Sequence, residues 1–177
     1  RRKPLFQVSI ANTGTDLSSH PLVQNADVIH LHWINQGFLS LDDIKKLIRI
    51  GKPVVWTMHD MWPCTAICHY SFGCERFKKE CGKCPFLSSS DKKDLSYHVF
   101  NKKRFLADSK IQLVAVSTWL RQQAQDSALT NRLPVEVIPN VIDTSLFVLS
   151  DKAEARKSLS LPLDKKIILM GAARIND

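Results

Sequence analysis

The segment from Pro53 to Pro85 constrains the fold of this chain most, because it joins a strand-like sequence to a cysteine-rich one. Its first part, Pro53–Met58, is a short apolar run typical of a buried β-strand. The run ends at His59 and Asp60, and all five cysteines of the chain follow before Pro85. Connections between a strand and a helix usually have about 2–6 residues, so this long polar connection indicates a specialised region. Titratable side chains at the end of a strand are typical of ligand sites in α/β proteins.

The composition is that of a globular domain. The chain has 177 residues, of which 44% are hydrophobic and 24% charged, and its formal net charge is +8. No apolar run reaches the ~20 residues of a membrane span, and no apolar segment follows the basic start Arg1–Lys3 as it does in a secretory signal. We therefore expect a cytoplasmic protein whose thiols stay reduced. The positive charge agrees with solubility alone, or with attraction to phosphates, anionic lipid headgroups or nucleic acid.

Strand-like and helix-like segments alternate along the chain. Strands are expected at 5–10, 27–32, 53–58, 111–116, 135–138 and 165–171. Helices are expected from Ser40 to about residue 50, at 93–107, after Ser117 and at 151–161, with Ser40 and Ser117 as N-caps. This alternation predicts a Rossmann-like α/β fold, in which helices cover both faces of a mainly parallel sheet and a cysteine-rich insert follows one strand.

Polar groups are predicted to gather at one edge of this sheet, because the carboxyl ends of parallel strands lie on the same side. The groups that follow the strands are His32 with Trp33, His59 with Asp60, Ser117, Asn140 and Arg174. That edge is predicted to be a ligand cleft. The alternative is that polar residues follow strands simply because loops begin there.

His59 is the candidate catalytic residue of this set, together with Asp60. An imidazole can donate or accept a proton near neutral pH, and an adjacent carboxylate can orient or charge it. The other members of the set are candidate substrate-binding residues. Ser117 is first of all a helix cap, and Arg174 follows small residues that would let a phosphate approach the backbone. His30 is interpreted as a hydrogen-bonded core histidine.

The cysteines are spaced as in a metal site. Their spacing is Cys64-x3-Cys68-x5-Cys74-x6-Cys81-x2-Cys84. Cys81 and Cys84 can bind one ion from two sides, and Cys68 and Cys74 can complete a structural zinc site, with Cys64 and His69 as spare candidates. Two alternatives stay open, namely free reduced thiols packed as small hydrophobes and disulfides formed on oxidation. A catalytic cysteine is less expected, since the cluster does not single out one nucleophile.

Several longer motifs resemble one known family. They are Asp27–Trp33 (DVIHLHW), Gly37–Ser40 (GFLS), Lys52–Pro63 (KPVVWTMHDMWP), Cys68–Tyr70 with Cys74, Cys81–Pro85 (CGKCP), Ala115–Leu120 (AVSTWL), Val137–Asp143 (VIPNVID) with Phe147, and Ile168–Arg174 (ILMGAAR). In this order they resemble family 4 glycosyltransferases, in particular bacterial enzymes of capsule, exopolysaccharide or O-antigen assembly. The resemblance covers nearly the whole chain.

The resemblance implies a GT-B architecture, in which two Rossmann-like domains enclose a cleft. It implies a nucleotide-sugar donor, a saccharide or lipid-linked saccharide acceptor, retention of anomeric configuration, and no catalytic divalent metal. In that family the histidine of the His-Asp pair lies beside the donor sugar, and His59 matches it. An arginine after the first strand of the second domain approaches the donor diphosphate, and Arg174 stands at that position.

The resemblance also implies a domain organisation. Residues 1–147 correspond to most of the N-terminal, acceptor-side domain with a cysteine-rich insert at 60–90, and residues 148–177 correspond to a linker and the first strand of the donor-side domain. The family begins with a strand and a glycine-rich turn that have no match here, so we expect a fragment. Because most of the donor-binding domain also has no match, we expect this fragment to lack transfer activity alone. Turnover of a nucleotide sugar by these 177 residues would contradict this. Ala66 and Ile67 replace glycines usual in the family, which leaves less room for close backbone approach.

Two other functions agree with parts of the sequence. A zinc-stabilised nucleic-acid-binding module would use the charge and the cysteines, but clustered aromatic residues for base stacking are lacking on the strands, so no nucleic acid is expected as a partner. A non-catalytic scaffold would not need His59. For a transferase, basic stretches at 76–79, 92–93 and 102–104 would favour peripheral contact with the inner face of an anionic membrane, although 102–104 also fits a solvated helix face.

Overall fold

The computed structural model describes residues 7–171, and the chain divides into two compact units. The first unit is Arg1–Asn140 and the second is Val141–Asp177. All strands of the described residues belong to the first unit. The candidate site is therefore built by the first unit.

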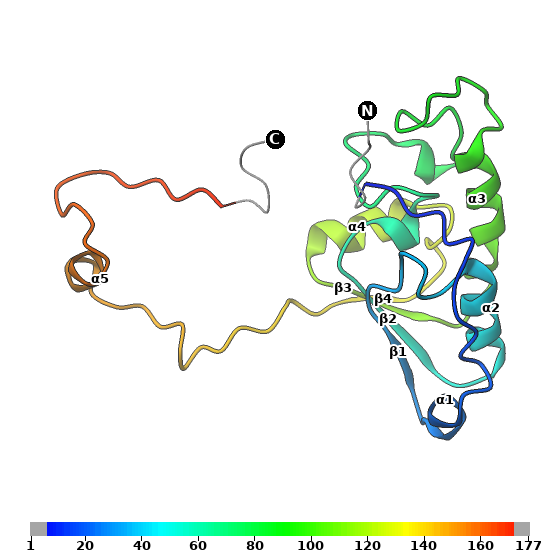
Figure 1. Ribbon diagram of the computed structural model, residues 1–177, viewed down its shortest axis with the longest axis horizontal. Helices are drawn as coiled ribbons and strands as arrows, with labels where there is room; N and C mark the ends of the chain where they lie inside the picture. The colour runs from blue at the N-terminus through cyan, green and yellow to red at the C-terminus, as the bar shows by residue number, and fades with distance from the viewer. Residues whose placement is uncertain (1–6, 172–177) are drawn as a thin grey trace. The chain divides into compact units, whose positions relative to one another are not determined.

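Four parallel strands form the sheet of the first unit (Figure 1). They are β1 (Ile29–Leu31), β2 (Val54–Met58), β3 (Gln112–Ala115) and β4 (Val135–Val137), and they pair in the order β1-β2-β3-β4. Leu31 lies opposite Trp56, and Met58 lies opposite Ala115, so the carboxyl ends of neighbouring strands meet at one edge. The predicted α/β fold with a parallel, Rossmann-like sheet is confirmed.

Helices connect consecutive strands, as parallel pairing requires. They are α2 (Leu41–Arg49), α3 (Leu95–Lys103) followed by the 3-10 turn η3 (Arg104–Leu106), and α4 (Thr118–Asp126), whereas α1 (Pro21–Asn25) precedes β1. α2 and α3 stand along the same side of the strands (Figure 1). The start of α2 is the predicted one, since Ser40 and Asp43 each accept a hydrogen bond from the backbone N–H of the other. The short helix α1 was not predicted.

The core consists of alternate strand residues and the apolar sides of the helices. In β2, Val54, Trp56 and Met58 are buried, while Val55 and Thr57 are partly exposed. Three of the four residues of β3 are buried, so β3 is the most enclosed strand. The helices add Ile44, Leu47, Leu120 and Ala124 to the same core. This packing gives the ends of β1 and β2 a rigid base.

The insert between β2 and α3 is irregular, with two short 3-10 turns, η1 (Trp62–Cys64) and η2 (Arg76–Lys78). Its first part is not a surface loop, because every residue from Met61 to Ile67 is buried. The hydroxyl of Ser127 donates a hydrogen bond to the carbonyl of Cys64 at 2.6 Å. The beginning of the insert is therefore part of the domain core.

The predicted strand at 5–10 does not join the sheet. Residues 5 and 6 lie outside the described residues, and Val8 makes only an isolated antiparallel bridge with Cys68. The backbone N–H of Ser9 donates to the carbonyl of Ile67 at 2.7 Å, and the N–H of His69 donates to the carbonyl of Gln7 at 3.1 Å. This segment is extended, as its pattern indicates, but its hydrogen bonds go to the insert.

The second unit contains the helix α5 (Lys152–Ser158), which the side chain of Asp151 caps. The predicted strand at 165–171 is not formed, and Ile168, Leu169 and Met170 are exposed. A strand needs a hydrogen-bonded neighbour, and the described part of this unit contains no strand to supply one. The apolar pattern alone was therefore not sufficient. Arg174 lies outside the described residues.

Candidate active site

Four predicted site residues come together at the carboxyl edge of the sheet. His32 and Trp33 follow β1, and His59 and Asp60 follow β2. Nδ1 of His32 lies 3.0 Å from Nε2 of His59, and Nε1 of Trp33 donates to Oδ2 of Asp60 at 3.1 Å. Parallel pairing of β1 with β2 thus places two residues of one strand end against two of the other.

Two other predicted residues lie apart from this contact group. Ser117 follows β3 and accepts a hydrogen bond from the N–H of Leu120 at 3.2 Å, so its side chain is the cap of α4. Asn140 follows β4 and is exposed. Both remain at the predicted edge of the sheet, but neither contributes to the network around Asp60.

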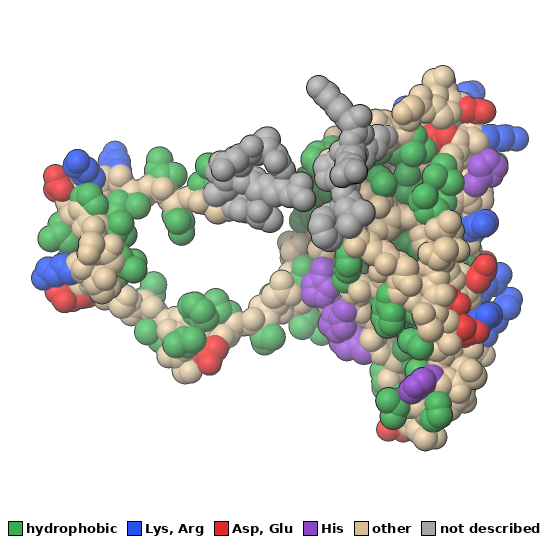
Figure 2. Space-filling model, viewed as in Figure 1, with side chains coloured by type: hydrophobic (Ala, Val, Ile, Leu, Met, Phe, Trp, Pro, Cys, Tyr) green, Lys and Arg blue, Asp and Glu red, His purple; other side chains and the backbone are tan. Residues whose placement is uncertain are grey.

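The contact between His32 and His59 joins two exposed imidazoles. Their rings stack with centroids 5.4 Å apart, and the ring of His30 lies 4.2 Å from that of His32. Figure 2 shows a group of exposed histidine side chains on this unit. Only one of the two nitrogens that face each other can carry the shared proton, so one ring donates this hydrogen bond and the other accepts it. His30 is exposed and not in the core, although Nε2 is hydrogen-bonded to Thr57 at 2.8 Å.

Asp60 binds other partners than the sequence indicates. Its carboxylate accepts hydrogen bonds from Nδ1 of His69 at 2.6 Å, from the N–H of Trp62 at 2.8 Å, and from Trp33. Burial opposes the charge of Asp60, but the bonds from His69 and Trp62 outweigh it and hold the pKa of Asp60 below its usual value. Asp60 is thus an ionised hydrogen-bond acceptor that holds neighbouring residues, and the predicted orientation of His59 by Asp60 is replaced by contacts to His69 and Trp33.

His69 is a site residue that the sequence analysis considered only as a spare metal ligand. It is buried, and its Nε2 lies 2.8 Å from the hydroxyl of Ser9. With Nδ1 donating to Asp60, a neutral ring accepts a hydrogen bond from the Ser9 hydroxyl at Nε2. No sequence signal indicated the chain Ser9–His69–Asp60, because irregular segments with no periodicity bring these residues together.

A cavity of about 320 Å³ opens beside this network. Its lining residues are Gln7, His59, Asp60, Met61, His69, Tyr70, Phe72 and Trp119. The titratable groups lie in one part of the sequence, after β2, and Trp119 comes from the first turn of α4. A cavity with aromatic and convergent polar side chains is typical of a small-molecule site.

Lys103 holds the first part of the insert by hydrogen bonds to its backbone. It is fully buried at the end of α3, and its Nζ donates to the carbonyls of Trp62 at 2.6 Å and Thr65 at 3.0 Å. The same Nζ lies 3.2 Å from the centroid of the Trp62 ring, in a cation–π contact. Burial lowers the pKa of Lys103 to about 7. The lysine therefore connects residues 62–65 to α3. Because the backbone N–H of Trp62 donates to Asp60, this connection also fixes one of the donors to Asp60.

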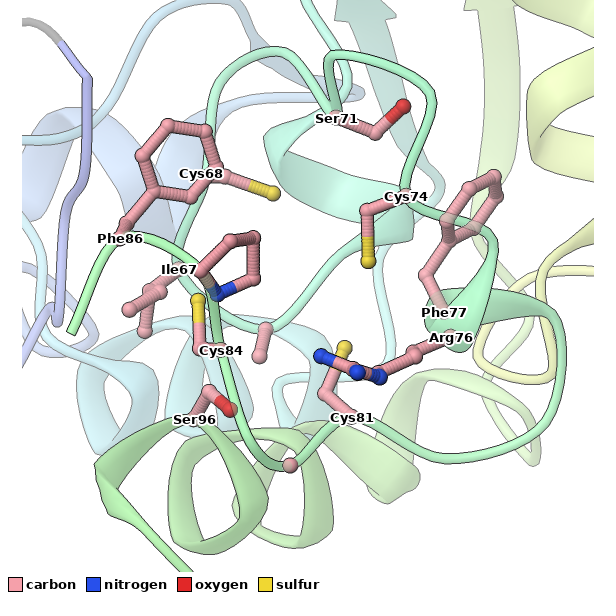
Figure 3. Close-up of a pocket in the computed structure, with 13 residues that line it drawn as sticks. Ile67, Cys68, Ser71, Cys74, Arg76, Phe77, Cys81, Cys84, Phe86 and Ser96 are labelled. Atoms are coloured by element: carbon pink, nitrogen blue, oxygen red, sulfur yellow. The ribbon is translucent and has the colours of Figure 1, made fainter. Parts of the chain in front are cut away.

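Four cysteines line a second, smaller cavity of about 20 Å³, which has room for roughly one water molecule. Figure 3 shows the sulfur atoms of Cys68, Cys74, Cys81 and Cys84 pointing toward a common space. All are free thiols. Cys64 is not among them, because it is fully buried with its Sγ 3.7 Å from Sδ of Met58.

The donor set fits zinc in residue type. Burial raises the pKa of Cys81 to about 12 and also raises the pKa of Cys84, while hydrogen bonds from backbone N–H groups, of Ala66 to Cys81 and of Phe86 to Cys84, act in the opposite direction. Such N–H groups stabilise thiolates. The arrangement fits less well, since within residues 7–171 no group of three or more histidine, cysteine, aspartate or glutamate side chains is placed to hold a metal ion. The sulfur atoms would have to approach one another on binding.

Comparison with known proteins identifies the class to which this parallel α/β domain belongs. Residues 15–146 match the family model for Glycosyltransferase Family 4. The match covers most of the chain and includes the contact group at the sheet edge, and the chain belongs to this family. The predicted resemblance is thereby confirmed.

A curated relative agrees with this assignment. Over 72 residues the chain is 36% identical to the protein named "Putative colanic acid biosynthesis glycosyl transferase WcaC" of Escherichia coli strain K12. The aligned segment covers 39% of this chain and 17% of that protein's length. No solved structure matches the chain significantly.

The buried Lys103 predicts a specific pH dependence in metal-free, reduced protein. Its pKa is about 7 in the folded chain and 10.5 for a lysine surrounded by water, so unfolding takes up a proton in this range and the free energy of unfolding rises with pH. Between pH 7 and 8.5, urea unfolding should show a rise about 1–2 kcal/mol larger in the native chain than in Lys103→Met. The exposed neighbour provides the control, because Lys102→Met should keep the native slope. Equal slopes in the native chain and Lys103→Met would show that Lys103 does not titrate in this way.

Proposed function

We propose that this chain is part of a glycosyltransferase that moves a sugar from a nucleotide-sugar donor to a saccharide or lipid-linked saccharide acceptor. The reaction retains anomeric configuration and serves the synthesis of a surface polysaccharide. The observation that carries the proposal is the family match over residues 15–146, which includes the contacting His32 and His59, and also Asp60. The colanic acid biosynthesis in the name of the E. coli relative supports a polysaccharide product. A nucleic-acid-binding module is not favoured by either comparison.

In this proposal His59 contacts the donor sugar. Its imidazole is exposed, lines the larger cavity and shares a proton with His32, so the pair can donate to or accept from a sugar hydroxyl. Asp60 is a positioning residue, since its carboxylate holds Trp33 and His69. These two roles agree with the surroundings of the two residues, since His59 is exposed and the Asp60 carboxylate is hydrogen-bonded to its neighbours.

The remaining site residues complete the proposal at the same edge of the sheet. We propose that Ser117, at the start of α4, and Asn140, after β4, contact substrate, and that Arg174 binds the donor diphosphate. Residues 1–147 would form most of the acceptor-side domain with the insert at 60–90, and 148–177 would lead into the donor-side domain. No catalytic metal is required in this scheme, because imidazole and guanidinium groups supply the polar contacts.

A cytoplasmic location with peripheral contact to an anionic membrane remains part of the proposal. Within residues 7–171, no helix combines the length and apolar character needed to cross a bilayer. Some of the basic residues are already paired, since Lys78 contacts Glu75 at 2.7 Å and Arg104 contacts Glu80 at 3.1 Å. Lipid contact would therefore depend on the other basic residues of the stretches at 76–79, 92–93 and 102–104.

The proposed role of His59 can be tested by substitution in a protein that carries this chain together with a donor-side domain. His59→Ala should lower kcat/KM for sugar transfer by about 100-fold or more, because the polar contact at the reacting sugar is lost. Folding should be unaffected, since the His59 side chain is exposed.

The matched control is His98→Ala, which removes an exposed histidine from α3 and should keep full activity. Radiolabelled sugar transfer and thermal unfolding of both variants provide the comparison. Unchanged transfer by His59→Ala would favour a non-catalytic scaffold instead.

We also propose that Cys68, Cys74, Cys81 and Cys84 hold a structural zinc ion. Four thiolates and Zn²⁺ carry a net negative charge, and a buried cation nearby would offset it. Lys103 is fully buried, and although burial lowers its pKa, charges at Cys64, Cys68 and Cys81 act in the opposite direction and favour its protonated form. The ion would fix the insert that carries His69, whose backbone is one residue beyond Cys68.

Metal analysis tests the zinc proposal directly. The purified chain should contain about one zinc ion, Cys81→Ser should lose it, and chelation should lower the melting temperature of the native chain. Cys64→Ala is the control that should retain zinc, because Cys64 lies outside the cavity. A zinc-free chain in which the four cavity thiols react freely, or are joined in disulfides, would contradict the proposal.

A further inference from the structure

Three large aromatic side chains form an exposed cluster beside the site. Tyr70, Phe72 and Trp119 are 49%, 67% and 47% exposed. The ring of Tyr70 lies 4.9 Å from that of Phe72, edge to face, and 5.7 Å from that of Trp119. Single exposed apolar residues are common on soluble proteins, but aromatic rings that contact one another on the surface usually mark a binding site.

The cluster is assembled from distant parts of the sequence. Tyr70 and Phe72 belong to the insert, directly after His69, and Trp119 is the second residue of α4. Phe72 has a positive φ of 49°, a conformation that is rare for a bulky residue, and Phe86 supports it with a ring contact at 5.7 Å. The fold thus holds an exposed ring in an unfavourable backbone conformation, which hydrophobic burial within the chain does not explain.

The same three side chains line the cavity of about 320 Å³ together with Gln7, His59 and Asp60. The cavity lining therefore combines aromatic rings with hydrogen-bonding groups. A pyranose ring has matching surfaces, because its axial C–H bonds form an apolar face and its hydroxyls project from the edge. Aromatic side chains bind such C–H faces, and amide, imidazole and carboxylate groups bind hydroxyls.

The negative charge at the cavity favours an uncharged sugar ring over the phosphate groups of the expected substrates. Asp60 is ionised and lines the cavity, so a phosphate or diphosphate group placed there would meet a negative charge. An uncharged sugar ring meets no such repulsion. A nucleobase could stack on the same rings, but it presents no set of hydroxyls to Gln7, His59 and Asp60.

We propose that Tyr70, Phe72 and Trp119 form a stacking platform for a pyranose ring, with its hydroxyls directed toward Gln7, His59 and Asp60. The identification of this ring as part of the acceptor saccharide rests on the proposed function. The platform adds a recognition site made by the insert and α4 to the histidine pair at the strand ends, and it gives the insert a direct part in substrate selection.

Saturation-transfer difference NMR on the 177-residue chain tests this inference without turnover. The probes are methyl β-glucoside, methyl β-galactoside, lactose and, as a separate arm, UDP. At least one saccharide should receive saturation, strongest at the protons of its C–H face. Trp119→Ala should reduce this signal about five-fold or more, and Trp119→Phe should restore much of it, because a ring is present again.

The control variant is Phe38→Ala, which removes an equally exposed ring that does not line the cavity and should leave the signal unchanged. Thermal unfolding checks that Trp119→Ala is folded, as its exposure leads us to expect. Absence of saturation for every saccharide, or a signal that Trp119→Ala leaves intact, would overturn the platform. So would saturation of the UDP base that Trp119→Ala abolishes, since the rings would then bind a nucleobase.

The outcome can be separated from that of the proposed function. If a protein with the donor-side domain transfers sugar while Trp119→Ala changes neither saccharide binding nor the KM for acceptor, only the platform is wrong. If saccharides bind through Trp119 but the protein with the donor-side domain turns over no nucleotide sugar, the platform stands as a saccharide-binding site and the proposed transferase function is wrong.

Discussion

The hydrogen bonds of the Asp60 carboxylate are the interaction on which the site depends. Asp60 follows β2, yet its partners come from other segments. They are Trp33 after β1, Trp62 in the 3-10 turn η1, and His69 of the insert, whose Nδ1 lies 2.6 Å from the carboxylate. One side chain therefore connects two strand ends to an irregular segment. An ionised acceptor with three donors is worth more in a partly buried position than in water, so removing any partner would loosen the others.

The insert can take part in this network because it is packed as core. Residues from Met61 to Ile67 are buried, and Lys103 donates hydrogen bonds to the carbonyls of Trp62 and Thr65. Enclosing an ammonium group costs several kcal/mol, which the cation–π contact and two hydrogen bonds partly offset. The negative charge of the proposed metal-thiolate cluster would offset more of the cost of burying the Lys103 ammonium group. The insert then presents His69, Tyr70 and Phe72 from a fixed base.

The regular part of the fold could be predicted from the sequence, and the irregular part could not. The apolar runs of β1 and β2 and the caps Ser40 and Ser117 are local signals, and the parallel topology follows from their order, which places His32 beside His59. The contact of His69 with Asp60 and the meeting of Tyr70 with Trp119 depend on nonlocal packing of loops, for which no periodicity exists. The prediction of a strand at 165–171 was wrong for a related reason, because an apolar pattern does not indicate whether a partner strand is available.

The ring nitrogens of His69 report on the central contact most directly. Long-range ¹H–¹⁵N correlation NMR of histidine-labelled protein at neutral pH identifies which nitrogen of each imidazole carries the proton. If Asp60 organises the site, the proton of His69 lies on Nδ1, donated to the carboxylate, and stays protected from exchange with solvent. A His69 ring protonated only at Nε2, or alternating rapidly between both tautomers, would contradict this organisation.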